Sequence, residues 1–261
     1  MKITGSGNDF VMFNNLKRVV KNRRQIAIQV CRQKYGVGAD GAIFLEKSRK
    51  ADYRMRIFNP DGSEAEMCGN GLRCLVRFIH EQKLSRKKTF LIETLAGNYK
   101  TFINGFDVSI EMFLVEKPRF NINLEINGTK IIAHLMNTGV PHAVIIVEDV
   151  ETLDVKKYGP LIRYHRTFQP SGANVDWLQI INRHFGKIRT YERGVEDETL
   201  ACGTGIVASV ICAAMLNKFS SPVEIEARSG EKLNVSFTDD FSQIFFKGKT
   251  KLVFEGQWIN R

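Results

Sequence analysis

The sequence lacks the long apolar segments that membrane proteins and secreted precursors carry. Its 261 residues contain no run of about 18 apolar residues, the length that a helix needs to cross a bilayer. The stretch 1–13 holds one lysine and no apolar core segment, which is not typical of a signal peptide. These absences predict a cytoplasmic protein without a membrane partner.

Paired cysteine motifs are also missing. The chain has 5 cysteines, an odd number, and no CxxC pair, which argues against a disulfide scaffold and against a zinc ribbon. No metal is therefore expected. Most cysteines in a reducing compartment are small buried apolar groups. We expect this for Cys74 and Cys212, which have apolar neighbours, whereas Cys31 is uninformative.

The charge is strongly basic but scattered. The formal net charge is +10, and the lysines and arginines form separate short clusters with few aromatic residues between them. No nucleic-acid-binding signature is present, so a solvated surface is the favoured interpretation, with steering of an acidic substrate as the second. The length fits one large domain or two of about 130 residues.

Short runs rich in Val, Ile and Phe recur along the chain, and turn residues such as Asn104-Gly105 and Asn127-Gly128 bracket them. These runs predict strands and two hairpins. The expected strands are Phe10–Phe13, Ala42–Leu45, Tyr53–Phe58, Phe90–Glu93, Val108–Phe113, Ile131–Leu135, Ala143–Val147, Val175–Ile181, Ile188–Tyr191 and Ile244–Phe246. The expected helices are Val19–Lys34, Gly71–Lys83, Thr152–Arg163 and Gly205–Leu216. A β-rich α+β protein follows.

The chain contains an internal near-repeat, because four landmarks recur in the same order at similar spacing. The pairs are Gly7–Phe10 with Gly139–His142, Phe58-Asn59 with Tyr191-Glu192, Cys68–Gly71 with Cys202–Gly205, and Glu93–Gly97 with Glu226–Gly230. The repeat predicts two similar domains with a boundary near Glu116–Pro118, the first over 1–116 and the second over 117–249. Like elements of the two halves would then face each other across a cleft.

Each half places a cysteine directly before a Gly-x-Gly and an apolar helical run. The cysteine is therefore expected at a helix N-terminus, where uncovered N–H groups and the helix dipole favour anions. This position should lower the pKa of the thiol, and the same amides could hold a substrate carboxylate. A single Cys-Gly-x-Gly is more simply a buried cysteine before a turn, but two copies in equivalent places favour chemistry.

Two thiols on opposite sides of a carbon suit the inversion of a stereocentre. One thiolate removes a proton, the other thiol supplies one, and their roles exchange in the reverse direction. The helix N-termini would stabilise the negative charge that develops on the substrate carboxylate. The pattern thus predicts a cofactor-independent amino-acid racemase or epimerase that uses Cys68 and Cys202.

The sequence resembles the diaminopimelate epimerase family over nearly its full length. The residues that carry the resemblance are Gly5–Phe10, Gly36–Asp40, Phe58–Glu64, Met67–Gly71, Tyr191–Gly194 and Ala201–Gly205. Related proline racemases typically have histidine where this chain has Asn70, and phenazine-biosynthesis-like isomerases lack the cysteine pair.

The resemblance implies two domains related by pseudo-twofold symmetry, each a curved, mostly antiparallel sheet around a central helix, with the active site in the cleft between them. A C-terminal strand at about 250–261 would complete the first domain. The implied reaction interconverts LL- and meso-2,6-diaminopimelate, in the synthesis of lysine and of peptidoglycan precursors. No cofactor is implied, and a homodimer is expected.

The resemblance also assigns roles to residues. Cys68 and Cys202 are the acid/base pair. Main-chain groups around Gly69, Asn70, Gly203 and Thr204 hold the α-carboxylate, and His142 and Glu192 tune the thiols. The substrate-binding side chains are Asn8, Asn59, Asn174, Glu192 and Arg193. Without the resemblance, the asparagines are as well explained as turn residues, Glu192-Arg193 as a surface ion pair and His142 as a structural histidine.

Two positions depart from the common family pattern. Gly41 stands where many members have glutamine, and Val140 where many have an asparagine that contacts the distal end of the substrate. Valine cannot form that hydrogen bond, so a racemase of broader specificity, for example for glutamate, is the alternative. A thiol redox protein and a nucleic-acid-binding protein are the weaker interpretations from other classes.

Overall fold

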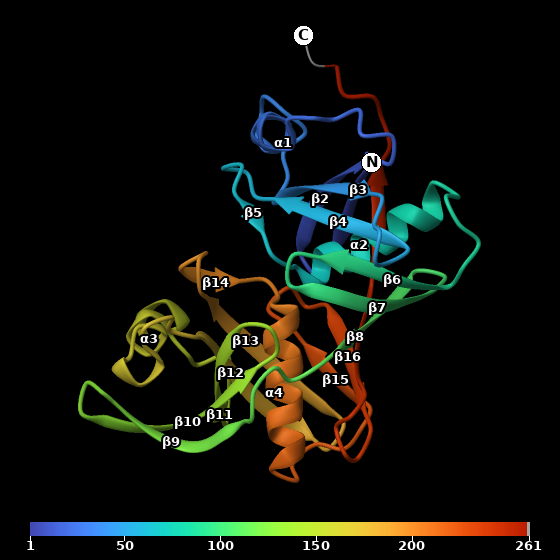
Figure 1. Cartoon of the computed structure of the whole chain (residues 1–261). Helices are drawn as coiled ribbons and strands as arrows, with labels where there is room; N and C mark the ends of the chain where they lie inside the picture. Colours follow the sequence, from blue (N-terminus) through green and yellow to red (C-terminus); the bar gives the residue numbers. More distant parts are fainter. Residues whose placement is uncertain (260–261) are drawn as a thin grey trace. The chain divides into compact units, whose positions relative to one another are not determined.

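The computed structural model describes residues 1–259, whose contacts divide the chain into two compact units. Unit 1 comprises Met1–Glu111 and the chain from Lys247 onward, and unit 2 comprises Met112–Phe246. Figure 1 shows both units as strands gathered around helices.

Unit 1 is a mixed sheet packed on two helices. Its elements are β1 (Lys2–Gly5), β2 (Asn8–Asn14), α1 (Arg23–Cys31), β3 (Gly41–Glu46), β4 (Tyr53–Phe58), β5 (Glu64–Ala65), α2 (Gly69–Glu81), β6 (Thr89–Thr94), β7 (Gly97–Asn104), β8 (Asp107–Met112) and β18 (Lys251–Phe254). The β2–β3 and β4–β6 pairs are parallel, whereas β18–β1, β1–β2, β3–β4, β6–β7 and β7–β8 are antiparallel. Helix α2 contacts β1 to β4 and β7, and α1 packs on β3 and β4.

Unit 2 repeats this plan. Its elements are β9 (Arg119–Ile126), β10 (Thr129–Asn137), β11 (Pro141–Val147), α3 (Val155–Arg163), η1 (Arg166–Phe168), β12 (Asn174–Asn182), β13 (Phe185–Glu192), β14 (Asp197–Thr199), α4 (Gly203–Met215), β15 (Val223–Glu226) and β16 (Lys232–Phe237). Through β17 (Ile244–Lys249) the chain passes back to unit 1. The β11–β12 and β13–β15 pairs are parallel, at the places that β2–β3 and β4–β6 occupy in unit 1.

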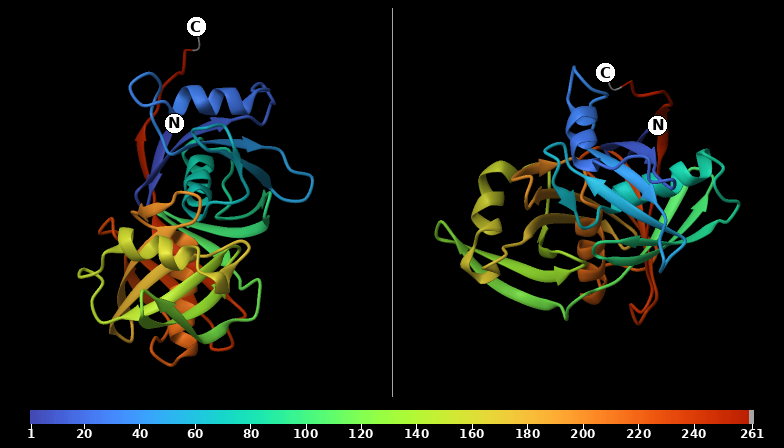
Figure 2. Two further views of the ribbon diagram at one scale, coloured as in Figure 1. Left: turned by 90° about the vertical axis from the view of Figure 1, so that its left-hand side faces the viewer. Right: turned by 45° about the horizontal axis from the view of Figure 1, so that its top comes forward.

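Helix α4 shows why each sheet surrounds a helix. Its sequence, GTGIVASVICAAM, is apolar on every side, and eleven of its thirteen residues are buried. A helix that is apolar all round must be covered on all sides, and α4 contacts β10, β11, β12 and β16. Figure 2 shows the strands of unit 2 curving around it. Cys74 in α2 and Cys212 in α4 are fully buried, which confirms that both are core residues.

The α+β class is confirmed, and all ten expected strands are present. Asn127 and Gly128 both have positive φ and form the two-residue turn between β9 and β10, as the Asn-Gly signal predicts. Strands such as β7 and β9 escaped prediction because they show only alternation of buried and exposed residues. The expected terminal strand is β18, and residues 260–261 lie outside the described residues.

The helix predictions need correction at their ends. The helix expected over Val19–Lys34 spans only Arg23–Cys31, because the Asn22 side chain accepts the Gln25 N–H and caps it. Helices α2 and α4 each begin two residues earlier than expected, since the Gly-x-Gly segment is itself helical. Within residues 1–259 no helix is both long and apolar enough to cross a membrane.

Candidate active site

In unit 1, Cys68 is the residue that caps α2. It has extended backbone angles, and its Sγ accepts the Gly71 N–H at 3.3 Å. Cys68 is half-buried. A Cβ on Gly71 would lie 2.9 Å from Ile43 Cδ1, so glycine allows the start of α2 to lie close against β3. The predicted position of this thiol at a helix N-terminus is confirmed.

A chain of side-chain hydrogen bonds fixes the asparagines of unit 1. Arg73 Nη2 donates to Asn70 Oδ1 at 2.7 Å, Asn70 Nδ2 donates to Asn8 Oδ1 at 2.8 Å, and Asn8 Nδ2 donates to Asp40 Oδ2 at 3.1 Å. Arg73 and Asn70 are buried. These hydrogen bonds fix the positions of the nitrogen and the oxygen of each side-chain amide, so Asn8 and Asn70 are oriented before any ligand binds.

Asn59 is apart from this chain of bonds. It is exposed just after β4, and its Nδ2 donates to Ser63 Oγ at 2.9 Å. Its own N–H donates to the Ser63 carbonyl at 2.8 Å. In unit 1, Asn59 is therefore a turn residue with an accessible side chain, which is compatible with the binding role that the resemblance implies.

In unit 2, Cys202 caps α4 with extended backbone angles, and Gly203, Thr204 and Gly205 form the first turn. It is only 7% exposed, and its Sγ lies 3.4 Å from Thr204 Oγ1. Burial, followed by the carboxylates of Glu192 and Asp176, raises the pKa of Cys202 well above its ordinary value; the Thr204 hydroxyl and the Gly205 amide act in the opposite direction. The expectation that the helix N-terminus lowers this pKa is wrong for Cys202, because desolvation of the thiolate outweighs the dipole.

His142 lies in a buried polar cluster behind α4. Its Nδ1 is 2.7 Å from Asp176 Oδ2 and its Nε2 is 3.0 Å from Thr204 Oγ1. Thr190 Oγ1 donates to the other oxygen of Asp176 at 2.8 Å. His142 and Asp176 are both fully buried. A Cβ on Gly205 would lie 2.3 Å from Asp176 Oδ1, so only glycine lets α4 begin this close to the carboxylate.

Asn174 and the residues after β13 form the rest of the unit 2 site. Asn174 Oδ1 accepts the Arg193 N–H at 2.7 Å, and its Nδ2 donates to the Pro141 carbonyl at 3.3 Å. The Arg193 guanidinium donates to the Ser171 carbonyl at 3.4 Å. Burial raises the pKa of Glu192, with the Thr199 hydroxyl and His142 opposing that shift. Asn174 thus ties β11 to the segment that carries Glu192 and Arg193.

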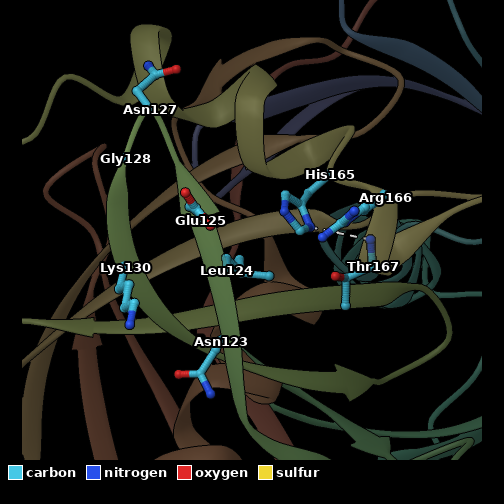
Figure 3. A pocket seen from close by; sticks show the side chains of 9 residues that line it. All are labelled: Asn123, Leu124, Glu125, Asn127, Gly128, Lys130, His165, Arg166 and Thr167. Atoms are coloured by element: carbon cyan, nitrogen blue, oxygen red, sulfur yellow. Dashed lines mark hydrogen bonds between the residues drawn. The ribbon is translucent and has the colours of Figure 1, made fainter.

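A separate cavity of about 620 Å³ lies in unit 2 between the β9–β10 hairpin and residues 165–167. Figure 3 shows Lys130 and Glu125 on the hairpin and His165 and Arg166 on the other wall. None of its lining residues belongs to the predicted site. Among residues 1–259, no three His, Cys, Asp or Glu side chains gather in a metal-binding arrangement.

Comparison with known proteins agrees with this geometry. The family model for diaminopimelate epimerase matches residues 1–112 and 134–253. The chain belongs to the diaminopimelate epimerase family. Among its relatives, the diaminopimelate epimerase of Aquifex aeolicus is 42% identical over 98% of this chain and 96% of that protein. That of Methanocella arvoryzae is 38% identical over 98% and 95%.

Solved structures outside this family share its fold. A phenazine biosynthesis protein of the PhzF family from Bacillus anthracis has a TM-score of 0.74 at 16% identity, covering 95% of this chain and 94% of that one. A hydroxyproline epimerase from Agrobacterium vitis has a TM-score of 0.71 at 14% identity, covering 96% and 89%. The fold of the diaminopimelate epimerase family is therefore shared with racemases, epimerases and PhzF proteins.

Sequence reasoning did not find Asp176, Arg73 and Asp40. Two of them, Asp176 and Arg73, have a signal in retrospect. Asp176 is a lone carboxylate within the apolar run Val175–Ile181, and Arg73 is a basic residue between the apolar residues Leu72 and Cys74 of α2. A charged residue in a buried element must be paired, and in both cases the partners belong to the candidate site.

Proposed function

We propose that this protein interconverts LL- and meso-2,6-diaminopimelate by moving the α-proton between Cys68 and Cys202. The observation that carries the proposal is the position of both cysteines. Each caps a helix at the equivalent place of a repeated unit. The mechanism requires the two thiols to reach opposite faces of one α-carbon.

The first turns of α2 and α4 supply the charge stabilisation that proton removal needs. The N–H groups of Gly69-Asn70 and Gly203-Thr204 belong to these turns, where the first backbone donors have no partner within the helix. Such donors bind a carboxylate and stabilise the charge that develops on it. The distal amino-acid end of the substrate is assigned to Asn8, Asn59, Asn174, Glu192 and Arg193.

The experiment is proton NMR of the reduced protein with LL-diaminopimelate in deuterated water, beside Cys68→Ala and Cys202→Ala. We expect the α-proton signal to disappear as the meso form grows, and each substitution to abolish formation of the meso form. Inversion that survives either substitution would contradict the cysteine pair. A wild type that leaves every amino acid tested unchanged would contradict the proposed function altogether.

Val140 supports a second candidate of broader specificity. It is half-buried in the turn that precedes β11, and its side chain offers no hydrogen bond to a distal amino or carboxylate group. Glutamate, which is shorter, would then also be racemised. Glutamate turnover that is no faster than in Cys202→Ala would remove this candidate, and Val140→Asn should restore preference for diaminopimelate.

The same proposal includes a cytoplasmic homodimer with neither a membrane nor a nucleic-acid partner. The scattered basic clusters support a solvated surface. Light scattering coupled to size-exclusion chromatography would measure the mass against the 29.7 kDa of one chain. A salt-sensitive gel shift with DNA or RNA would contradict the absence of a nucleic-acid partner.

A further inference from the structure

A continuous line of side chains connects Cys202 to a buried carboxylate in unit 2. In order, the four residues are Cys202, Thr204, His142 and Asp176. The joining distances are 3.4 Å from Sγ to Thr204 Oγ1, 3.0 Å from that oxygen to His142 Nε2, and 2.7 Å from His142 Nδ1 to Asp176 Oδ2. His142 and Asp176 have no exposed surface.

The hydrogen-bonding capacities of these groups fix the direction of each bond. A carboxylate can only accept, so Asp176 requires the proton of neutral His142 to be on Nδ1. Nε2 then carries a lone pair and accepts from the Thr204 hydroxyl, which has a single proton to give. In its other hydrogen bond, Thr204 Oγ1 must therefore accept, and the S–H of Cys202 is the donor.

We propose that Thr204 relays the proton of Cys202 to His142, and that Asp176 is the positioning residue that holds the imidazole for this transfer. The inference rests on the proposed function and adds the base that serves one of its two thiols. The S–H bond of Cys202 breaks as its proton passes to Thr204 Oγ1, while the Thr204 hydroxyl proton passes to His142 Nε2. The products are a thiolate, an intact threonine and an imidazolium, and the net charge is unchanged.

The surroundings of Cys202 explain why a local base is needed. Burial and the neighbouring carboxylates raise the pKa of this thiol, so loss of its proton to solvent is unfavourable. Transfer to His142 creates a thiolate and an imidazolium together, and the ionised carboxylate of Asp176 stabilises the imidazolium. The charged and titratable groups that face His142 are Asp176 on β12, Glu192 on β13 and Cys202 at the start of α4.

Unit 1 shows that this arrangement is not a consequence of the fold. Phe10 pairs with Gly41 between β2 and β3 as His142 pairs with Asn174 between β11 and β12. Two residues further along, Ile43 lies against the Gly71 position, where Asp176 lies against that of Gly205. The places of the histidine and the aspartate are thus apolar in unit 1, so the repeat alone does not produce the relay residues.

The first test is nitrogen-15 NMR of the wild type, with the His142 signals assigned by comparison with His142→Gln. We expect neutral His142 to carry its proton on Nδ1. A proton on Nε2 would overturn the relay, because Nε2 could then no longer accept from Thr204. This measurement needs no substrate, so it can overturn the relay whether or not the proposed function holds.

The second test compares variants by kinetics. Asp176→Asn and Thr204→Val should lower kcat about 100-fold to 10,000-fold with little change in KM, by analogy with loss of the orienting carboxylate of a serine-protease triad. Thr204→Ser keeps the hydroxyl and should recover most of the activity. Thr190→Val is the control, because it removes the other hydrogen bond to Asp176 and leaves the bond to His142. An equal loss in Thr190→Val, or no rescue by serine, would show a merely structural role.

The third test uses alkylation by iodoacetamide at neutral pH, followed by mass spectrometry of both cysteines in the same sample. Asp176→Asn removes a carboxylate that raises the pKa of Cys202, and this change alone would speed modification. Loss of the relay acts in the opposite direction, and we expect it to slow modification of Cys202 at least about 10-fold, with Cys68 within about twofold of the wild type as the internal control. Equal slowing of both thiols would overturn the relay. A wild type that epimerises diaminopimelate while Asp176→Asn matches it in both assays would overturn the relay and leave the proposed function intact.

Discussion

The side chain that contacts the first turn of α2 at Gly71 is apolar in unit 1, whereas the side chain that contacts the first turn of α4 at Gly205 is ionisable in unit 2. Ile43 contacts the Gly71 position, and Asp176 contacts that of Gly205. Cys68 is half-buried, and Cys202 is buried. The two units share strand order and the pattern of parallel pairs, so the repeat sets where each thiol lies while the side chains around it set its protonation.

The difference has a chemical reason. A two-base inversion needs one thiol deprotonated and the other protonated at the same time. Two identical environments would give both thiols the same tendency to ionise. In this protein burial and the carboxylates of Glu192 and Asp176 keep the proton on Cys202, whereas the matching residues of unit 1 are Asn59 and Ile43.

The largest expected difference between the units is in the effect on kcat of replacing the second glycine of each Cys-Gly-x-Gly segment by alanine. Gly205→Ala places a Cβ 2.3 Å from Asp176 Oδ1, so the carboxylate must move away from His142. We expect at least about a 100-fold loss of kcat. Gly71→Ala meets the flexible ends of Ile43 at 2.9 Å and of Ile57 at 3.2 Å, and should cost less than about 10-fold, since strain of this kind is relieved by small side-chain shifts. Steady-state kinetics on both variants tests the comparison, and similar losses would contradict it.

Arg73 should be the next most sensitive position. Its guanidinium donates to Asn70 and Ser6 inside unit 1, whereas the matching position of unit 2 is the apolar Val207, also fully buried. Arg73→Leu leaves buried acceptors without their donor, which should lower the free energy of unfolding by about 2–4 kcal/mol. Urea denaturation measures this change. A loss below about 1 kcal/mol would show that Asn70 and Ser6 are satisfied in other ways.

Two of the binding asparagines, Asn174 and Asn59, should differ in how much they contribute to stability. Asn174 is buried and accepts the Arg193 N–H, so Asn174→Ala should cost about 1–2 kcal/mol of stability and also raise KM. Asn59 is exposed, so Asn59→Ala should change stability by less than about 0.5 kcal/mol while still raising KM. Thermal melts and kinetics distinguish these outcomes. A stable Asn174→Ala protein would contradict the positioning that we assign to Asn174.

The smallest expected effect is the modification of the buried thiols of Cys31 and Cys212 by iodoacetamide. Burial raises the pKa of Cys31 and of Cys212, each to about 12. A raised thiol pKa means that the proton is held at every pH below that value, so neither thiol forms appreciable thiolate between about pH 7 and 9. We expect mass spectrometry to find both unmodified by iodoacetamide in this range. Modification of Cys31 or Cys212 at a rate near that of Cys68 would contradict their place in the core.

The sequence was sufficient for the features that depend on local pattern. The apolar runs predicted the strands, the Asn-Gly signals predicted the hairpin turns, and the paired Cys-Gly-x-Gly segments predicted thiols at helix N-termini. The cluster behind Cys202 could not be predicted, because Asp176, Thr190 and His142 come from three strands whose pairing is long-range. The predicted direction of the Cys202 pKa shift was wrong for the same reason, because the thiol is desolvated and brought near the carboxylates only when the chain folds.

The central claim is that two different thiols act on opposite faces of the substrate. The most direct measurement follows wild-type protein with LL-diaminopimelate in deuterated water at early conversion, and analyses the product and the recovered substrate separately. The account predicts deuterium at the inverted centre of the meso product and protium in the unreacted LL substrate, because one thiol keeps the removed proton while the other delivers deuterium. Equal deuterium in recovered substrate and product would indicate a single base and would contradict it.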